Sequence, residues 1–130
     1  MLTTPAYAYL IYLVSALVML GVFAVIYSRI TAFDEMALIR AGNGAAALSY
    51  CGALVGFSLT LYSSIATHAT YGMFLAWAAG AMVTQVVAYS IVARVIRGMN
   101  QAIHENNIAM GGLMGGVSLS VGIINAACLT

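Results

Sequence analysis

The chain has 130 residues, of which 64% are hydrophobic and only 5% are charged, and its formal net charge is +1. Soluble globular domains carry about 25% charged residues, so this composition excludes a soluble domain and predicts an integral membrane protein. The sequence contains no lysine and its four arginines are scattered, which gives nucleic-acid binding no support.

Charged residues divide the sequence into long uncharged stretches. They are absent before Arg29, between Arg40 and Arg94, and after Glu105. A helix needs about 20 apolar residues to cross a hydrocarbon core of about 30 Å. The outer stretches therefore hold one span each, and the middle stretch holds two with a turn between them. Within a single membrane domain over residues 1–130, we predict spans over residues 6–28, 43–66, 71–93 and 107–129.

The first span, residues 6–28, is apolar on all sides, and no positive charge precedes it. We therefore interpret it as a retained span and not as a signal peptide. Tyr9 and Tyr27 stand 18 residues apart, which is a rise of about 27 Å in a helix, and Tyr71 and Tyr89 repeat that spacing. Because tyrosine is enriched at both faces of a bilayer, these rings are predicted to lie in the aromatic belts.

The connection after the first span, residues 29–40, is charged and precedes a Gly-Asn-Gly break. Thr31 stands three residues before Asp34, which resembles a capping box at the start of a helix. A short amphipathic helix at the membrane surface is predicted from four residues at helical spacing, namely Phe33, Met36, Ala37 and Arg40.

Small residues form a stripe along the second span, with Ala45, Ser49, Gly52 and Gly56 at spacings of three and four. Lipid supplies no hydrophobic force between helices, so such stripes mark close helix contacts. In the fourth span four glycines form two overlapping pairs, Gly111 with Gly115 and Gly112 with Gly116. Each glycine costs a helix about 1 kcal/mol relative to alanine. We therefore expect all six glycines to serve helix packing, and the second span to be central.

All charged residues lie in the two connections, residues 29–40 and 94–105. The positive-inside rule places both connections in the cytoplasm and both termini outside, in the periplasm. Similar residues recur 64 positions apart: Ile39, Asn43, Ala45 and Gly52 correspond to Ile103, Asn107, Ala109 and Gly116. The predicted fold is thus an all-α membrane protein of four transmembrane helices. They form two parallel two-helix repeats, residues 1–66 and 71–130, with short amphipathic cytoplasmic connections.

Two stretches carry a resemblance to a known family: I-R-A-G-N-G-A-A-A-L-S-Y-C-G-A-L-V-G-F, which begins at Ile39, and the closing S-V-G-I-I-N-A-A. The chain resembles the YjfL-like family of small bacterial inner-membrane proteins, a domain of unknown function, over nearly its whole length. This resemblance implies an inner-membrane location and no established activity. The residues that match as pattern residues, without an assigned role, are Asn43, Gly44, Gly56, Asn107 and Asn125.

Two asparagines, Asn43 and Asn107, stand where the second and fourth spans are predicted to begin. Asparagine is a preferred N-cap because its side-chain oxygen accepts a hydrogen bond from a free backbone N–H, and capping is the favoured interpretation. The alternative is that the two positive helix ends attract an anion or a lipid phosphate. Arg40 and His104, which precede the asparagines, would then assist.

Uncharged polar residues lie within the predicted spans, namely Ser58, Thr60, Gln85 and Asn125. Hydrogen bonding between helices is the favoured role for them, and a polar lining of a small pore is the alternative. The two histidines, His68 and His104, are predicted on opposite membrane faces, so no metal site is expected. No set of catalytic residues can be assembled at one depth, so neither a cofactor nor an enzyme activity is predicted.

The leading functional hypothesis is a structural or adaptor subunit of the bacterial inner membrane. It would sit in the lipid bilayer, form a homo-oligomer through its glycine-rich helices and recruit a cytoplasmic protein through its connections. The alternative is a small oligomeric channel or permeation module lined by serine, threonine, asparagine and glutamine.

Overall fold

The computed structural model describes residues 5–30, 35–67 and 70–129. These residues form six helices: α1 (Pro5–Ile30), α2 (Glu35–Arg40), α3 (Gly44–Thr67), α4 (Tyr71–Val95), α5 (Met99–His104) and α6 (Ile108–Cys128). The four long ones, α1, α3, α4 and α6, are long and apolar enough to cross a membrane. Their ends differ from the predicted spans by no more than two residues, so the predicted all-α fold with four spans is confirmed. The predictions that concern Thr31, Phe33, Asp34 and His68 fall outside the described residues.

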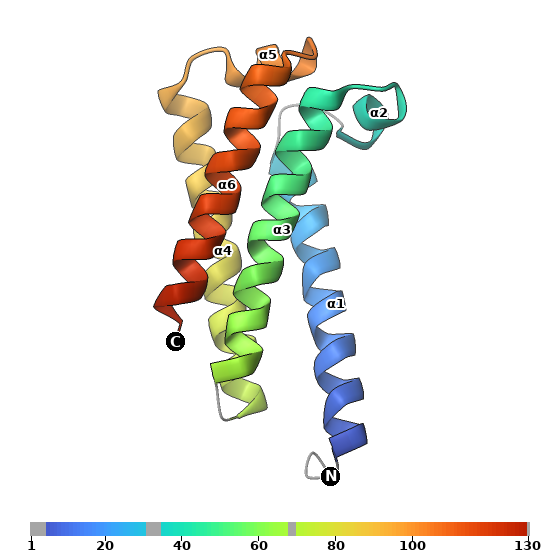
Figure 1. Cartoon of the computed structure of the whole chain (residues 1–130), viewed down its shortest axis with the longest axis vertical. Coiled ribbons are helices and arrows are strands. Elements are labelled where there is room, and N and C mark those ends of the chain that lie inside the picture. The colour runs from blue at the N-terminus through green and yellow to red at the C-terminus, as the bar shows by residue number, and fades with distance from the viewer. Residues whose placement is uncertain (1–4, 31–34, 68–69, 130) are drawn as a thin grey trace.

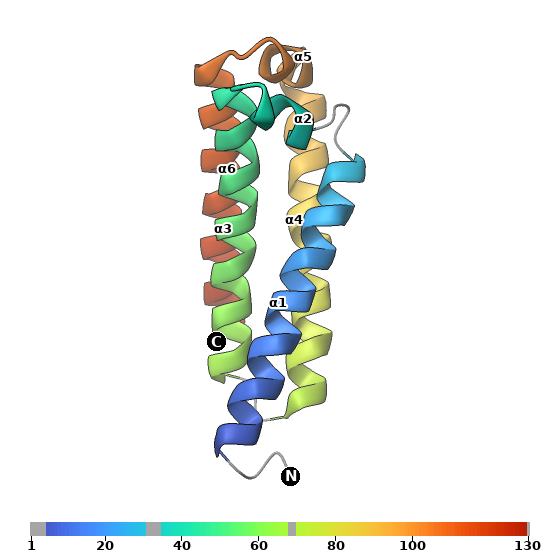
Figure 2. The ribbon, with the colours of Figure 1, turned by 90° about the vertical axis from the view of Figure 1, so that its right-hand side faces the viewer.

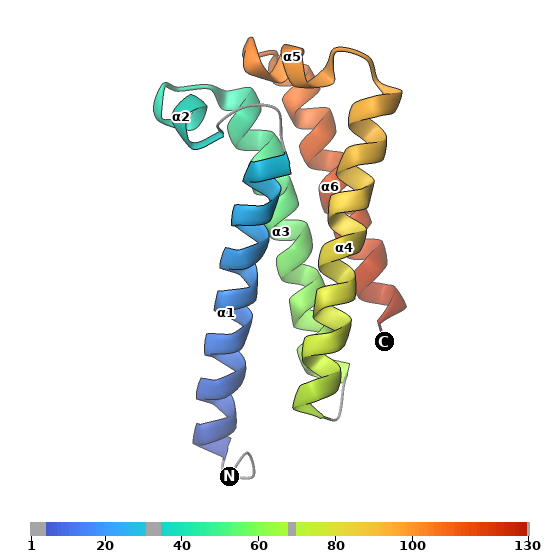
Figure 3. The same cartoon turned by 180° about the vertical axis from the view of Figure 1, so that it is seen from behind.

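The long helices lie side by side, and α2 and α5 lie at one end of the bundle (Figure 1). We call this end the connection end. Helix α1 begins and α6 ends at the opposite end, as the view from behind also shows (Figure 3). Helices α3 and α6 therefore both run away from the connection end and pack in parallel.

Helix α3 is the centre of the bundle, because it contacts each of the other five helices. Helices α3 and α6 form one layer of the bundle, and α1 and α4 lie on one side of that layer (Figure 2). Thr60 of α3 pairs with Gly122 of α6, 62 positions later, and Ser63 pairs with Ala126, 63 positions later. These spacings are close to that of the sequence similarity. That the chain consists of two similar halves remains a prediction. These contacts agree with it.

Helix α1 is peripheral, and only Phe23 and Tyr27 of its side chains are buried. Phe23 stacks on Phe57 of α3, with ring centroids 4.6 Å apart. The rest of the helix exposes apolar side chains such as Leu10, Val14, Leu17 and Val18. A bilayer solvates such a surface, so exposed apolar faces are expected of a membrane-spanning helix.

The two short helices end in the same backbone motif, in which the second residue after the helix takes a left-handed conformation. After α2 this residue is Gly42, with φ 90°, and after α5 it is Asn106, with φ 64°. In both turns the N–H of that residue and of the next one bond back to carbonyls of the helix, as in a Schellman motif. Asparagine tolerates the left-handed region better than most residues, which explains how it can replace glycine in the second turn.

Two of the four tyrosines assigned to the aromatic belts lie inside the protein. Tyr27 is 1% exposed and Tyr89 is 4% exposed, and their ring centroids are 5.0 Å apart. The belt prediction is therefore wrong for these two rings. Slim glycine-rich helices leave space near the connection end, and large rings fill that space. Tyr9, at the opposite end of α1, is 66% exposed.

Candidate functional site

The contact between α3 and α6 brings backbone against backbone. A Cβ atom on Gly52 would lie 2.2 Å from the carbonyl oxygen of Gly115, and one on Gly111 would lie 2.3 Å from that of Ala45. A Cβ on Gly56 would lie 2.7 Å from the carbonyl oxygen of Ser118. A Cβ on Gly115 would lie 2.3 Å from the carbonyl oxygen of Leu48. These four glycines therefore occupy places where no side chain fits, in agreement with the packing role that the sequence predicts for them.

The other two predicted packing glycines, Gly112 and Gly116, lie on a different face of α6. Nothing lies within 4 Å of a Cβ on Gly116, and a Cβ on Gly112 would meet only Leu48 Cδ1, at 4.0 Å. Both line an open apolar groove on the outside of the α3 and α6 pair. A glycine that the sequence analysis missed, Gly122, packs within the pair instead, where a Cβ would lie 2.3 Å from the Cα atom of Gly56.

At the connection end, Asn43 joins the start of α3 to the end of α5. Its Oδ1 accepts a hydrogen bond from the N–H of Ala46 at 2.9 Å. Its Nδ2 donates to the carbonyl oxygens of Ile103 and His104, at 3.0 Å and 3.1 Å. The side chain thus caps one helix and bonds to the last two carbonyls of another, of which that of Ile103 also accepts from the N–H of Asn106.

The second connection supplies two further caps. Asn106 Oδ1 accepts from the N–H of Ala45 at 3.1 Å, across the helix pair, and Asn107 Oδ1 accepts from the N–H of Met110 at 3.3 Å. The sequence analysis missed Asn106, which acts on α3 although it lies before α6. Arg40 and the side chain of His104 are exposed. Two N–H groups in the first turn of α3 are thus already bonded to side chains, so an anion would have to displace a cap to reach them.

The four polar residues predicted for the spans bond to backbone carbonyls. Thr60 is fully buried and donates to Gly56 of its own helix at 3.1 Å and to Gly122 of α6 at 3.2 Å. Gln85 donates from Nε2 to the carbonyl of Ser118 at 3.4 Å, and Asn125 donates to that of Ala81 at 3.5 Å. Ser58 bonds within its helix, to Leu54 at 2.8 Å. Three of them therefore tie α3, α4 and α6 together.

A buried carboxyl group near the connection end was not predicted. Glu35, the first residue of α2, is 1% exposed, while Met36 beside it is 47% exposed and Arg40 is exposed. The predicted short helix is present, but its first acidic side chain points into the protein and not toward solvent.

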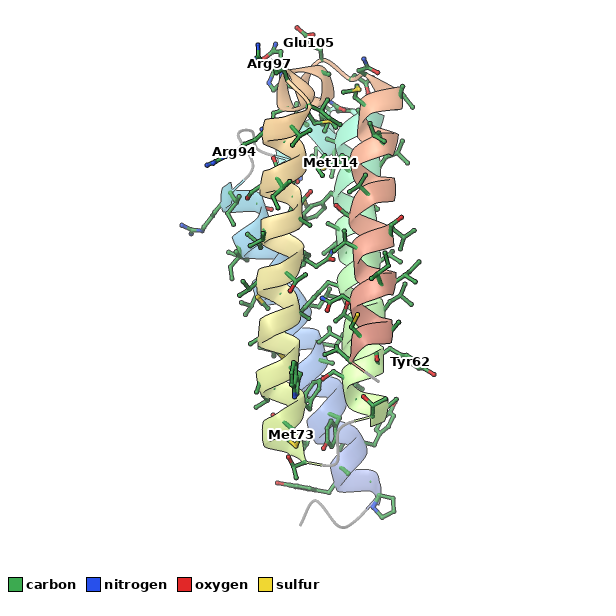
Figure 4. The ribbon with its side chains drawn as sticks, turned by 90° about the vertical axis from the view of Figure 1, so that its left-hand side faces the viewer. Tyr62, Met73, Arg94, Arg97, Glu105 and Met114 are labelled. Carbon is green, nitrogen blue, oxygen red and sulfur yellow. The ribbon has the colours of Figure 1, made fainter. Side chains whose placement is uncertain are left out.

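An opening of about 280 Å³ lies beside Tyr89 at the same end of the bundle. The hydroxyl of Tyr89 donates to Asn100 Oδ1 at 2.8 Å, and both residues line the opening. The full lining comes from three helices: Ile30 of α1, Tyr89, Ser90, Ala93 and Arg94 of α4, and Asn100 of α5. Figure 4 shows Arg94, Arg97 and Glu105 at this end, pointing away from the bundle, whereas Met114 lies between the helices.

Comparison with known proteins places the chain in a family. Residues 1–129 match the family described as Domain of Unknown Function (DUF350). The chain is 33% identical to the UPF0719 inner membrane protein YjfL of Escherichia coli strain K12 over 123 residues, which cover 95% of this chain and 93% of that protein. The same protein of E. coli O157:H7 matches with the same identity and coverage. No solved structure matches. The chain therefore belongs to the DUF350 family, as its resemblance to YjfL-like proteins predicted.

Proposed function

We propose that the protein is a structural or adaptor subunit of the bacterial inner membrane that associates with itself through the outer groove of α3 and α6. The observation that carries this proposal is the position of Gly112 and Gly116. These glycines are not used in the contact between α3 and α6, and they face outward in an apolar groove. An inner-membrane location is supported by the relatives.

Two openings follow one another along the outer faces of α3 and α6. Near the connection end the groove is lined by Leu48, Cys51, Gly52, Val55, Gly112, Gly115, Gly116 and Leu119. Toward the opposite end the same faces continue with Leu59, Tyr62, Ser63, Ala66, Thr67, Ile123, Ala126 and Ala127. Tyr62 stands at its rim and points outward (Figure 4). Helices α1 and α4 cover the other side of the pair (Figure 2), so this groove is the uncovered side.

A second copy of the chain fits this groove chemically. Small residues let two helix backbones approach closely, which is the main source of helix association in lipid. Two copies that meet through the same face form a closed two-fold pair. The uncovered faces of both copies are then buried at once.

The native cysteine in the groove provides the test. Cys51 is exposed and lines the groove, so a short bismaleimide should join two copies in native membranes when Cys128 is replaced by serine. The dimer should form in the Cys128→Ser chain and fall at least several-fold when Gly116→Leu fills the groove. Gly21→Leu on α1, where nothing lies within 4 Å, is the matched control and should leave the dimer unchanged. Equal dimer yield in all three chains, or none in any, would refute the proposed surface.

The channel alternative has less support within one chain. Thr60, Gln85 and Asn125 all bond to carbonyls of neighbouring helices. None of them lines any of the four openings described for this structure. Within the part of the chain that the structure describes, these three side chains therefore join neighbouring helices.

The proposed orientation has both connections in the cytoplasm and both termini outside. It is supported by the position of the arginines, because Arg40, Arg94 and Arg97 are exposed at or near the connection end and positive charge favours the cytoplasmic face. This end would then be the surface for a cytoplasmic partner. A cysteine placed at exposed Glu105 should be labelled by an impermeant maleimide in inverted vesicles and not in intact spheroplasts; the reverse pattern would invert the orientation.

A further inference from the structure

The opening beside Tyr89 differs from the others in the charge of its lining. It has a volume of about 280 Å³ and is lined by residues of α1, α4 and α5. Of the four openings described for this structure, it alone has a charged side chain in its wall, that of Arg94. No acidic residue of the described chain is in that wall. The opening is therefore electropositive, and it suits a negatively charged group.

Two side chains of this lining have hydrogen-bond donors to spare. Arg94 is exposed, and it makes no ion pair within the part of the chain that the structure describes. Asn100 Oδ1 accepts from the hydroxyl of Tyr89 at 2.8 Å, so Nδ2 is the part of this amide that is left to donate. Guanidinium and amide N–H groups are common ligands of phosphate oxygens in proteins. The donor set therefore indicates a phosphate group.

The opening lies at the depth where two spans end. Ile30 is the last residue of α1, and Arg94 is the next-to-last residue of α4. The polar headgroups of a bilayer begin where its apolar core ends, so the opening is level with them. Arg94 points away from the bundle (Figure 4) and thus toward the surrounding lipid. A phosphate that belongs to the bilayer itself is therefore within reach.

The helix faces that lead from the opening into the membrane are apolar. On α4, Ile91 and Val87 precede Arg94 by three and seven residues, which places all three on one face. Ile91 is 56% exposed and Val87 is 48% exposed. On α1, Ile26 precedes Ile30 by one turn and is 36% exposed. Acyl chains can cover these side chains while the headgroup occupies the opening.

We propose that this opening binds the phosphate headgroup of one anionic phospholipid. Arg94 pairs with a phosphate oxygen, and Nδ2 of Asn100 donates to a second one. Pockets for whole small molecules measure about 300–1,000 Å³, so this smaller opening takes the headgroup alone and leaves the acyl chains in the bilayer. A zwitterionic lipid brings a positive charge beside Arg94, which disfavours it. The site shares no lining residue with the groove between copies, so it does not depend on the proposed self-association.

Lipid binding to the full chain provides the test. The chain is purified in a mild non-ionic detergent and mixed with phosphatidylglycerol, or with phosphatidylcholine of the same acyl chains. Native mass spectrometry then counts the bound lipids. We expect one phosphatidylglycerol per chain, bound about five-fold more tightly than phosphatidylcholine, because one arginine near an anionic membrane surface contributes about that factor. Excess inorganic phosphate should not displace the lipid, since it gains nothing from the apolar faces.

Matched arginine variants separate this site from the general charge of the connection end. Arg94→Gln should abolish the preference for phosphatidylglycerol, Arg94→Lys should retain it, and Asn100→Ala should weaken binding several-fold. Arg97→Gln, at an exposed arginine of the same end that does not line the opening, should behave like the unmodified chain. Equal Tm values of Arg94→Gln and Arg97→Gln without added lipid show that both variants are folded. The proposal is overturned if the unmodified chain binds both lipids equally, if Arg97→Gln loses as much preference as Arg94→Gln, or if inorganic phosphate displaces the lipid.

Discussion

Replacing Gly52 by alanine is expected to lower the free energy of unfolding by about 3 kcal/mol or more, because the added methyl group has no room. The new Cβ atom would lie 2.2 Å from the carbonyl oxygen and 2.5 Å from the Cα atom of Gly115. These are backbone atoms, which cannot move aside as the end of a flexible side chain can. The two helices would have to separate along much of their length. The change can be measured by unfolding the purified chain with increasing fractions of a denaturing detergent.

The matched control is Gly21→Ala on α1, outside the proposed contact between copies. A Cβ at Gly21 meets nothing within 4 Å, and alanine is a better helix former than glycine by about 1 kcal/mol. This variant should therefore be as stable as the unmodified chain or slightly more stable. Equal losses in both variants would mean that Gly52 and Gly115 do not touch in the membrane.

Replacing Asn43 by alanine is expected to cost about 3 kcal/mol. The variant loses an N-cap, which contributes about 1 kcal/mol, and two hydrogen bonds to carbonyls of α5, which contribute about 1 kcal/mol each. The largest local effect should be on α5, whose last two carbonyls lose the hydrogen bonds from Nδ2 of Asn43. Hydrogen exchange of the α5 amides, measured with the stability of the whole chain, checks both expectations.

The other asparagine provides the comparison for this prediction. Asn107 caps α6 with one bond, at an exposed position, so Asn107→Ala should cost only about 1 kcal/mol. Asn43→Asp keeps the capping oxygen but cannot donate, and it should fall between the two alanine variants. If Asn43→Ala and Asn107→Ala lose the same stability, the link from Asn43 to α5 contributes nothing.

The spans and their caps could be predicted from the sequence because each depends on local patterns. Charged residues bound the apolar stretches, and asparagine before a run of small apolar residues indicates a helix start. The central place of α3 follows from its stripe of small residues. Which of the two overlapping glycine pairs of α6 packs against α3 could not be predicted. Gly111 with Gly115 and Gly112 with Gly116 have the same spacing on neighbouring faces, and only the packing of α3 distinguishes them.

The burial of Glu35 and of two tyrosines could not be predicted either. An acid in a short charged connection is usually solvated, and tyrosine near the end of a span usually faces the bilayer interface. Glu35, Tyr27 and Tyr89 depart from these rules, because all three side chains are at most 4% exposed. Asn106 was missed for a similar reason. Its role depends on the parallel contact of α3 with α6, which places the end of one connection against the first turn of the other half.

The central claim is that the outer groove of α3 and α6 joins copies of the chain. The most direct measurement is a count of subunits in lipid bilayers, by stepwise photobleaching of singly labelled chains at high dilution. We expect at least two chains per spot for the unmodified protein and for Gly21→Leu, and single chains for Gly116→Leu. Single chains in all three, or unchanged assemblies in Gly116→Leu, would contradict it.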